Sequence, residues 1–465
     1  MPDFEVYQSP FSWRYGSDTM RHLWSESNKR KIWRKVWVAL AEVQSHFGLV
    51  THEQVADLKN HIHDIDLPRS IEIEAEIRHD LMAELKTFAE QAPLGGRILH
   101  LGATSMDIED NADALRLRDG LDLIQEELLQ VIVDLSHLID KYADTPLMAF
   151  THLQPAEPST LGYRFAMYAQ DLLADYRSLQ IIRRNELRGK GFKGAVGSRA
   201  SYGELVGIER LDEFETQLSD ELGLSFFPIT AQTYPRRQDF IIISALAGVG
   251  ACLHKMALDI RFLQSPPIGE LAEPFSDKQV GSSAMPFKRN PIHSEKIDSL
   301  GRYLAQFPRL AWDNAAFSML ERTLDDSANR RTMLPEVFLT LEEMLLTAHS
   351  ILKKLNINEQ AIQHNLATYG PFAGTERIML AAVKAGADRQ TIHESLRKHA
   401  MSAWQEIQAG KDNPLLNSLL QDKEIRNYLS EVQIRDLLDA RHHVGDCPTR
   451  ARSISASIWE LQKNN

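Results

Sequence analysis

A clear helical pattern lies in NADALRLRDGLDLIQEELLQVIVDLSHLIDKY, which runs from Asn111 to Tyr142. Its large apolar residues recur at alternating steps of four and three, at Leu117, Leu121, Ile124, Leu128, Val131, Leu135 and Leu138. This spacing is the 3.5-residue period of helices that pack along a continuous seam. At 1.5 Å per residue, such a helix spans roughly 45 Å. The stretch therefore predicts one long helix inside a helical bundle.

Further long helices are expected on the C-terminal side of this one. A second is predicted from about Ser159 to Arg188, a third from near Asp239, a fourth from near Asn290 and a fifth after Pro335. Asn290 followed by proline is a favourable helix start, because Asn caps free N–H groups and proline suits the first helical position. No convincing alternation typical of strands appears, so the sequence predicts an all-α protein.

The third predicted helix, DFIIISALAGVGACLHKMALDI, is apolar nearly all round. Other helices must surround such a helix, from the same chain or from neighbouring subunits. Its uncharged run between Asp239 and Lys255 is shorter than the ~20 residues of a membrane span, which favours a buried helix in a soluble protein. We expect three helical domains, an N-terminal one at residues 1–104, a central long-helix bundle at 105–356 and a C-terminal one at 357–465.

The composition restricts the classes of function. The formal net charge of −12 argues against non-specific binding to nucleic acid. Two cysteines, with no CxxC pair, indicate a reducing compartment rather than a disulfide scaffold. The first residues show no basic segment followed by an apolar run, the mark of a secretory signal. We expect a cytoplasmic protein without nucleic-acid or membrane partners, in which local cations hold any anionic ligand.

Three short patterns are poor candidates for cofactor or metal sites. GKGFKG (189–194) matches G-x-G-x-x-G but follows a long polar helix instead of a strand, so a flexible loop between helices is predicted. HHVGDC (442–447) has the spacing of no standard zinc site, and HIHD (61–64) is equally weak. We therefore expect no cofactor and no metal.

Several other stretches combine groups that suit acid–base chemistry. They are RHD (78–80), GATS (102–105), THLQPAEP (151–158), GSSAMPFKRNPIHSEK (281–296) and ERTLDDSANRR (321–331). Each alone is readily explained by helix caps, surface ion pairs or a buried histidine. Together they bring His, Ser, Thr, Lys and Arg to the ends of long helices, without a metal-ligand set. This combination favours a polyanionic small molecule as the substrate.

The loop GSSAMPFKRNP resembles the signature loop of the fumarase/aspartase superfamily, whose members eliminate fumarate from their substrates. Within it, the chain resembles the adenylosuccinate lyases through SWRYGSD, RHDLMAEL, LHLGATS, THLQPAEP, ITAQTYPR and LERTLDDSANRR. The resemblance covers nearly the whole chain from about Ser9. It implies an all-α tetramer in which the central helices of four subunits form one bundle and three chains build each active site.

The resemblance also implies the reaction, a β-elimination without cofactor or metal. Adenylosuccinate would give AMP and fumarate, and the succinylated carboxamide ribotide of the purine pathway would give its free carboxamide and fumarate. Ser282 would be the general base, with Lys288 and Asn290 beside it, since a serine is a weak base unless donors and positive charge stabilise its alkoxide. His152 would be the general acid, oriented by Glu295.

Binding roles follow from the same resemblance. The predicted phosphate ligands are Arg14, Tyr15, Arg322, Ser327 and Arg331, among which arginine suits phosphate through its bidentate fork. The predicted ligands of the succinyl carboxylates are Thr104, Ser105, Thr151 and Gln232. The residues expected to line the nucleotide are Arg78, His79 and Asp80. Lys296 stands where close relatives place an arginine, so this position keeps the charge but loses the fork.

Other functions remain as alternatives. Argininosuccinate lyase and fumarase need no phosphate clamp, so the cluster of Arg322, Ser327 and Arg331 argues against them. An inactive helical scaffold belongs to a different class, and the intact pair of Ser282 and His152 argues against it. An assay of fumarate release from adenylosuccinate, argininosuccinate and malate separates these alternatives.

Overall fold

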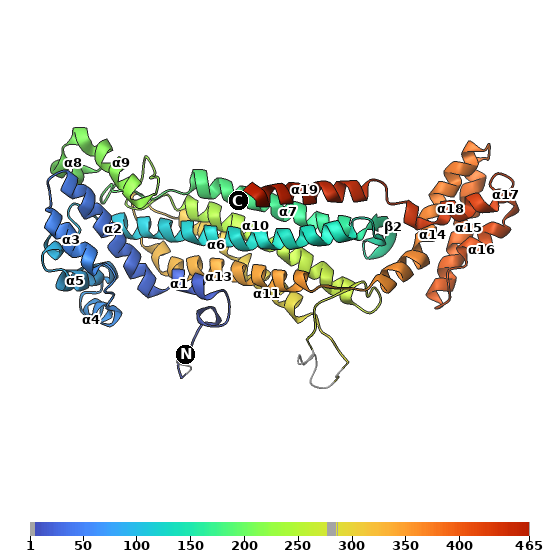
Figure 1. Ribbon diagram of the computed structural model, residues 1–465, viewed down its shortest axis with the longest axis horizontal. Helices are drawn as coiled ribbons and strands as arrows, with labels where there is room; N and C mark the ends of the chain where they lie inside the picture. The colour runs from blue at the N-terminus through green and yellow to red at the C-terminus, as the bar shows by residue number, and fades with distance from the viewer. Residues whose placement is uncertain (1–4, 277–284, 286, 465) are drawn as a thin grey trace. The chain divides into compact units, whose positions relative to one another are not determined.

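The computed structural model of the protein describes residues 5–276, 285 and 287–464. Within them the chain is predominantly helical, with two short antiparallel strand pairs (Figure 1), which confirms the predicted all-α class. Contacts divide the chain into two compact units. We call them unit 1 (residues 1–128, 175–251 and 299–346) and unit 2 (residues 129–174, 252–298 and 347–465). The division into three domains stays a prediction.

Helices make up most of the first half of the chain. The helices are α1 (Asp18–Leu23), α2 (Glu26–His46), α3 (His52–His61), α4 (Leu67–Ile77), α5 (Asp80–Gln91), α6 (Ser105–Tyr142), α7 (Leu161–Ile181), α8 (Ala200–Val206) and α9 (Leu211–Leu222). Strands β1 (Pro146–Thr151) and β2 (Gln154–Thr160) pair with each other. Single turns of other helix types lie at Pro10–Ser12, Gly95–Ile98, Ile182–Glu186 and Ile208–Arg210.

The second half is also mostly helical. Its helices are α10 (Arg237–Gln264), α11 (Ile292–Leu304), α12 (Phe307–Ala316), α13 (Asp325–Lys353), α14 (Glu359–Lys384), α15 (Arg389–Gln408), α16 (Leu415–Gln421), α17 (Lys423–Arg426), α18 (Glu431–Leu438) and α19 (Cys447–Asn464). A 3-10 turn lies at Ala440–His442, and β3 (Leu271–Ala272) pairs with β4 (Asn356–Ile357). Helices α14 to α18 enclose an apolar cluster of their own within unit 2.

Helix α6 carries the predicted seam. It ends at Tyr142, as predicted, and begins at Ser105, earlier than the predicted Asn111. Six seam residues are fully buried and Leu138 is half-buried, the six being Leu117, Leu121, Ile124, Leu128, Val131 and Leu135. Gly120 allows a close approach of α13, because a Cβ there would lie 2.8 Å from the ring of Phe338. The 3.5-residue pattern thus marks a packed face of this helix.

The prediction that a helix begins after Pro335 is wrong. Helix α13 begins at Asp325 and continues through this proline. A proline inside a helix removes one hydrogen bond, here to the carbonyl of Arg331, and costs about 3 kcal/mol. The helix persists because its neighbours, Val337 and Phe338 among them, are completely buried and stabilise it by tertiary packing.

The region before α7 also differs from expectation. Helix α7 is shorter at both ends than the predicted Ser159–Arg188 helix. The preceding residues form the β1–β2 hairpin, so the expectation of no strands is wrong here. Pro155 and Pro158 lie in β2, which is possible because a two-stranded sheet consists of edge strands only.

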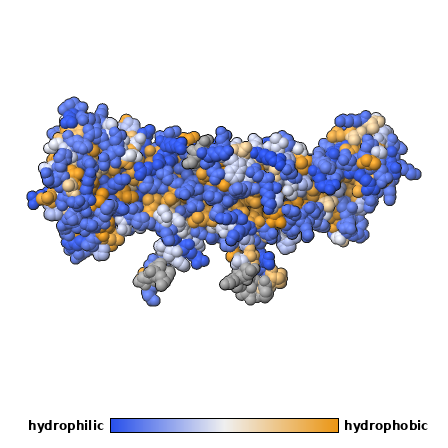
Figure 2. Space-filling view, in the orientation of Figure 1, coloured by the Kyte–Doolittle hydropathy of each residue, from blue (hydrophilic) through white to orange (hydrophobic). Residues whose placement is uncertain are grey.

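Helix α10 contains the apolar stretch that was predicted to need surrounding helices. It is the one helix in the described ranges that length and composition would allow to cross a membrane. Less than half of its most apolar window is buried within the chain. Its C-terminal half carries charged residues, and Lys255 and Arg261 pair with Asp259 and Asp298. Figure 2 shows that apolar residues reach the visible surface between polar ones.

Candidate active site

Unit 1 contains a cleft in which several predicted site residues come together. Four of them, Asp80, Arg322, Ser327 and Arg331, line it. Asp80 opens α5, Arg322 precedes α13, and Ser327 and Arg331 lie one turn apart on α13. Lys29 of α2 is a further cation of this cleft that sequence reasoning missed. The predicted phosphate cluster is therefore gathered in one place for three of its five members.

Neighbouring carboxylates orient the two cleft arginines. Arg322 Nη1 donates to Asp326 at 2.7 Å, and Arg331 Nη2 donates to Asp80 at 2.9 Å. The side chain of Arg331 is still 55% exposed, so part of its guanidinium can meet an incoming anion. Burial alone would raise the pKa of Asp80, but Arg331 and Lys29 outweigh this and lower it. Asp80 is thus charged at neutral pH and holds Arg331 in place.

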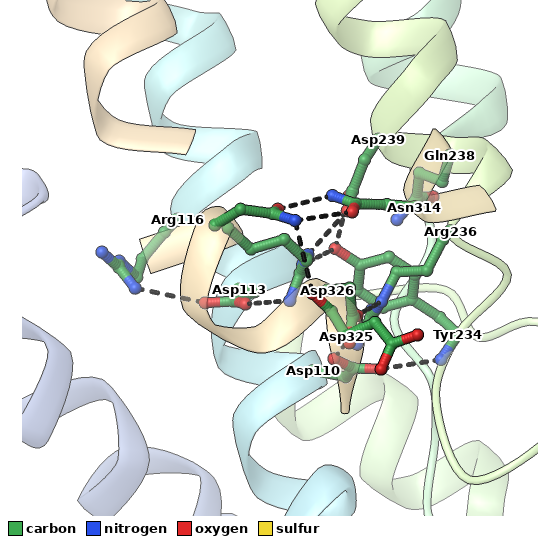
Figure 3. A network of polar contacts seen from close by, with 12 residues as sticks. Asp110, Asp113, Arg116, Tyr234, Arg236, Gln238, Asp239, Asn314, Asp325 and Asp326 are labelled. Carbon is green, nitrogen blue, oxygen red and sulfur yellow. Dashed lines mark hydrogen bonds and ion pairs between the residues drawn. The ribbon is translucent and has the colours of Figure 1, made fainter. Parts of the chain in front are cut away.

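Several residues that line this cleft belong to a buried polar network, which Figure 3 shows. Arg236 bridges Asp326 at 2.5 Å and Asp110 at 3.0 Å. Arg330, which neighbours Arg331 in sequence, binds Asp239 at 2.8 Å and donates to the Tyr234 hydroxyl at 2.7 Å. Because these residues come from α6, α10, α13 and the segment before α10, the network fixes the base of the cleft.

The network was not predicted, although the sequence contains a signal for part of it. Asp107, Asp110 and Asp113 recur every three residues on α6 between apolar positions. Acidic residues on the buried side of a helix need partners, since an unpaired buried charge is very costly. Asp113 accordingly forms ion pairs with Arg116 at 3.1 Å and with Arg330 at 3.2 Å.

Asp107 organises the GATS stretch. Its carboxylate accepts the Thr104 backbone N–H at 3.0 Å and the Tyr202 hydroxyl at 3.2 Å. It also pairs with Lys190 and accepts the backbone N–H groups of Lys193 and Gly194. GKGFKG is therefore a packed loop around a buried carboxylate, and the prediction of a flexible loop is wrong. Both lysines of the loop are almost completely buried, and they pair with Asp107 and Glu215, respectively.

Ser105, the last residue of GATS, lies beside His79, another predicted site residue. Ser105 Oγ is 3.3 Å from His79 Nε2. His79 and Arg78 form the two-residue connection between α4 and α5, and both are exposed. Arg78 ends α4 with a φ of 58°, a left-handed conformation that turns the chain sharply toward α5. The structure thus brings His79 and Ser105 together, next to the helix that begins with Asp80.

Arg14 and Tyr15 do not line the cleft of unit 1. Arg21 Nη1 donates to the Tyr15 carbonyl at 2.9 Å, and Gly16 N–H donates to Glu343 at 3.0 Å. The first contact ties the loop to α1, and the second holds it against α13. Gly16 has a φ of +76°, and a Cβ there would lie 2.6 Å from Leu339 Cδ2, so this tight turn requires glycine.

Gln232 belongs to the segment before α10. Its backbone N–H donates to the Glu321 carbonyl at 3.1 Å, next to Arg322 in sequence. The segment with Gln232 is therefore tied to the segment that carries one of the predicted phosphate ligands.

In unit 2, Thr151 and His152 lie at the tip of the β1–β2 hairpin. Thr151 pairs with Gln154, so His152 and Leu153 form a two-residue turn. Their φ values are 55° and 59°, and such turns usually use Asn-Gly because positive φ strains other residues. Both side chains are exposed. Strain of this kind is common at functional sites, where it aims a side chain, and it supports a special role for His152.

The other predicted groups of unit 2 surround the start of α11. Lys288 is exposed, Asn290 precedes the helix, Glu295 lies in its first turn and Lys296 follows Glu295. Arg261 Nη2 lies 3.9 Å from Glu295, and Arg261 Nη1 bonds Asp298 at 2.6 Å. Ser282 lies outside the described residues.

Glu109 lines the cleft of unit 1 and was not predicted as a site residue. Burial, together with the carboxylates of Asp80, Asp113 and Asp110, raises the pKa of Glu109 to about 8. A raised pKa means that the folded state favours the protonated acid. The protonated Glu109 therefore contributes its full stabilisation below the pKa of the unfolded state, near 4.5. This stabilisation is lost as the pH rises through the folded-state pKa of about 8.

We expect Glu109→Gln to flatten the pH dependence of stability. The wild type should lose roughly 2–4 kcal/mol more than this variant between pH 5 and pH 9, since glutamine stays neutral throughout. Thermal unfolding across this range measures the difference. Glu126→Gln, on the exposed side of the same helix, controls for loss of a carboxylate. Parallel pH profiles for the wild type and Glu109→Gln would contradict the prediction.

No group of three or more His, Cys, Asp or Glu side chains that could hold a metal ion occurs among the residues that the structure describes. The cationic groups of the cleft, Lys29, Arg322 and Arg331, instead suit an anion such as a phosphate.

Known protein families and curated relatives match the chain over most of its length. A family described as "Lyase" matches residues 15–303, and one described as "Adenylosuccinate lyase C-terminus" matches residues 371–453. The chain is 40% identical to the adenylosuccinate lyase of Schistosoma mansoni over 431 residues, 91% of this chain and 89% of the relative. It is 37% identical to that of Saccharomyces cerevisiae over 479 residues, 100% of this chain and 98% of the relative.

Solved structures show the same fold. A fumarate lyase from Mesorhizobium sp. BNC1 superposes with a TM-score of 0.84 at 25% identity, over 97% of this chain and 99% of that one. A 3-carboxy-cis,cis-muconate lactonizing enzyme from Pseudomonas putida gives a TM-score of 0.86 at 24% identity, over 98% and 100% of the chains.

Proposed function

Since the chain belongs to the adenylosuccinate lyase family, in the fumarase/aspartase superfamily, we propose that it eliminates fumarate from adenylosuccinate to give AMP. The same C–N lyase activity would release fumarate from the succinylated carboxamide ribotide of purine biosynthesis. One observation carries the choice of substrate. Arg322, Ser327 and Arg331 line one cleft, and carboxylates hold both arginines in position for a phosphate. Argininosuccinate and malate have no phosphate to fill it.

The elimination needs a base, an acid and a stabiliser of negative charge. The base removes a proton from the methylene carbon of the succinyl group, and the electron pair of that bond forms the double bond of fumarate. The C–N bond breaks, and the nitrogen keeps its electrons and receives a proton from the acid. We assign the base to Ser282, the acid to His152 and the stabilisation of the carboxylate-bearing intermediate to Lys288 and Asn290.

Release of fumarate tests the proposed activity. The purified protein should release fumarate from adenylosuccinate and release much less from argininosuccinate or malate. Preference for argininosuccinate or malate would assign the chain to another activity of the superfamily. Activity with none of the three would favour an inactive scaffold.

The phosphate cluster gives a more specific test. We expect Arg322→Ala and Arg331→Ala each to weaken binding of substrate and AMP by roughly 2–3 kcal/mol, because each removes a charge-assisted contact. Inhibition constants for AMP measure this effect separately from catalysis.

Arg397→Ala is a matched control for Arg331→Ala. Arg397 is 54% exposed and pairs with Glu394 at 2.8 Å on α15, whereas Arg331 is 55% exposed and pairs with Asp80 at 2.9 Å. The control should bind AMP as the wild type does. If Arg322→Ala and Arg331→Ala both bind AMP as tightly as the wild type does, the phosphate must be held elsewhere.

We further propose a homotetramer with active sites shared between subunits. Helix α10 supports this, because less than half of its apolar window is buried within one chain and Phe262 is 41% exposed. The pairing of Glu295 supports it as well. Among the described contacts of unit 2, Glu295 pairs with Arg261 and not with His152, which it should orient during catalysis. A second subunit could supply that histidine.

We also expect the enzyme to be soluble and cytoplasmic, and to bind neither nucleic acid nor membranes. The ion pairs of Lys255 and Arg261 on α10 support this expectation, since charged groups are costly in a lipid bilayer.

A further inference from the structure

Two side chains in unit 2, Gln264 and Glu273, bind the backbone near the end of the signature loop and at the start of α11. Gln264 is the last residue of α10. Its side-chain Oε1 accepts the backbone N–H of Glu273 at 2.9 Å, and its Nε2 donates to the Arg289 carbonyl at 3.0 Å. The partners fix the orientation of this amide, since an N–H needs the oxygen and a carbonyl needs the nitrogen. One side chain thus holds together two backbone positions that are 16 residues apart in sequence.

Glu273 makes the second connection. Its carboxylate accepts the backbone N–H of His293 at 3.0 Å and that of Ser294 at 2.5 Å. These N–H groups lie in the first turn of α11 and have no partner within the helix. Glu273 is only 7% exposed, so its side chain is packed inside the protein and is not a mobile surface group. A carboxylate at this helix end is also stabilised by the helix dipole.

The backbone before Glu273 is itself anchored. Leu271 and Ala272 form β3, which pairs with β4. The fully buried Glu270 pairs with Arg164 at 2.7 Å, and its carbonyl accepts the N–H of Asn358 at 2.9 Å. Glu273 therefore directly follows an anchored strand. Through its bonds to His293 and Ser294, it fixes the start of α11 relative to that strand.

The groups fixed by these contacts adjoin three predicted catalytic residues. Lys288 and Asn290 flank Arg289, whose carbonyl is held by Gln264. Glu295 follows Ser294, whose N–H is held by Glu273. Displacements of about 1 Å in catalytic groups can lower rates by about 100-fold.

We propose that Gln264 and Glu273 form a clamp that positions Lys288, Asn290 and Glu295 for the elimination. The clamp rests on the proposed function, and it adds two positioning residues that do not themselves react. Its loss should lower the rate of the chemical step while leaving the phosphate cleft of unit 1 unchanged, because none of that cleft's lining residues belongs to the clamp.

Glu273→Gln tests the clamp most directly. Glutamine has nearly the same size but presents one acceptor and one donor, so one of the two helix N–H groups loses its partner. We expect kcat to fall by about 10–100-fold, with the inhibition constant for AMP within about twofold of the wild type. Hydrogen exchange at His293 and Ser294 should become faster in the same variant, which reports the clamp without any assay of activity.

Gln264→Glu gives a second test if Glu273→Gln folds poorly. It keeps the acceptor for the Glu273 N–H and replaces the donor to the Arg289 carbonyl by a carboxylate oxygen. We expect the same loss of kcat with unchanged AMP inhibition. The matched control is Asp388→Ala, which removes the side-chain cap of α15, an acceptor for the Thr391 N–H at 2.9 Å, in a helix without predicted site residues. It should lower thermal stability without changing kcat.

The outcomes separate the clamp from the proposed function. If the wild type is active and both Glu273→Gln and Gln264→Glu keep a kcat within twofold of it, the proposed clamp is wrong and the proposed function stands. A fall in kcat matched by an equal fall in AMP affinity would overturn it too, because the effect would then be a general disturbance of the fold. A wild type that releases no fumarate from adenylosuccinate would overturn the proposed function and the clamp's role with it.

Discussion

Ser282→Ala is expected to lower kcat by about 10²–10⁴-fold while leaving the affinity for substrate nearly unchanged. The substitution removes the hydroxyl assigned as general base, and the succinyl methylene proton is only weakly acidic. Water is a poor substitute for the hydroxyl, because it is not covalently fixed in line with the carbon–hydrogen bond. The substitution leaves the proposed phosphate ligands in the cleft of unit 1 in place, so AMP should inhibit the variant as it inhibits the wild type.

The neighbouring serine provides the control. Ser283→Ala removes the same group one residue later in the GSSAMP stretch and should retain most of the wild-type kcat. Steady-state rates of fumarate release, with AMP inhibition constants measured alongside, compare the two variants. The assignment is wrong if Ser282→Ala keeps most of the wild-type rate, and a large loss in Ser283→Ala would then move the base to that residue.

The long helices could be predicted because their signal is local. The seam on α6 repeats every three or four residues, and burial follows this repeat at Leu117, Leu121 and Ile124. At Pro335, tertiary packing overrides the local signal. A local pattern indicates a break at this proline, but the buried residues around it come from a packed interface that local sequence does not reveal.

The hairpin that presents His152 was missed for a related reason. A two-residue turn is recognised by Asn-Gly or a similar pair, and His152 and Leu153 contain no such signal. Two prolines in β2 further favoured a loop. Only the pairing of β1 with β2 forces both turn residues to positive φ, and this pairing is a tertiary outcome.

The residues of the candidate site also fall into two groups, those that the sequence predicted and those that only the fold identifies. Ser327 and Arg331 could be placed on one helical face from their spacing, and Asp80 was included by resemblance. Lys29 and Glu109 were not predicted, because they join the cleft from helices distant in sequence. A carboxylate or an amide in a loop is usually a solvated surface group, so the functions of buried side chains such as Glu273 depend on partners that only the fold identifies.

Two inactive variants, His152→Ala and Ser282→Ala, are expected to restore activity to each other when their subunits are exchanged. This follows if one subunit supplies the acid and another supplies the base of each site. The contact of Glu295 with Arg261 rather than with His152 within one chain favours that arrangement. So does the partly uncovered apolar surface of α10, which would let the long helices of several subunits pack together.

The size of the recovery follows from the symmetry of a closed oligomer. With equal amounts of the two variants and random mixing, a site receives an intact serine with a probability of about one-half. It receives an intact histidine with the same probability, independently, because that residue comes from a different chain. Roughly a quarter of the sites are then complete, so the mixture should recover about a quarter of the wild-type activity.

The experiment denatures the two variants together, refolds them and measures fumarate release. Each variant refolded alone gives the background, and refolded wild type gives the full scale. Sedimentation shows whether the products are tetramers, and a mass tag on one variant shows whether subunits have exchanged. Activity no greater than the two backgrounds combined, in a mixture that has exchanged, would place both residues in one chain. A protein that sediments as a monomer would exclude the shared site altogether, because a monomer has no second chain to complete it.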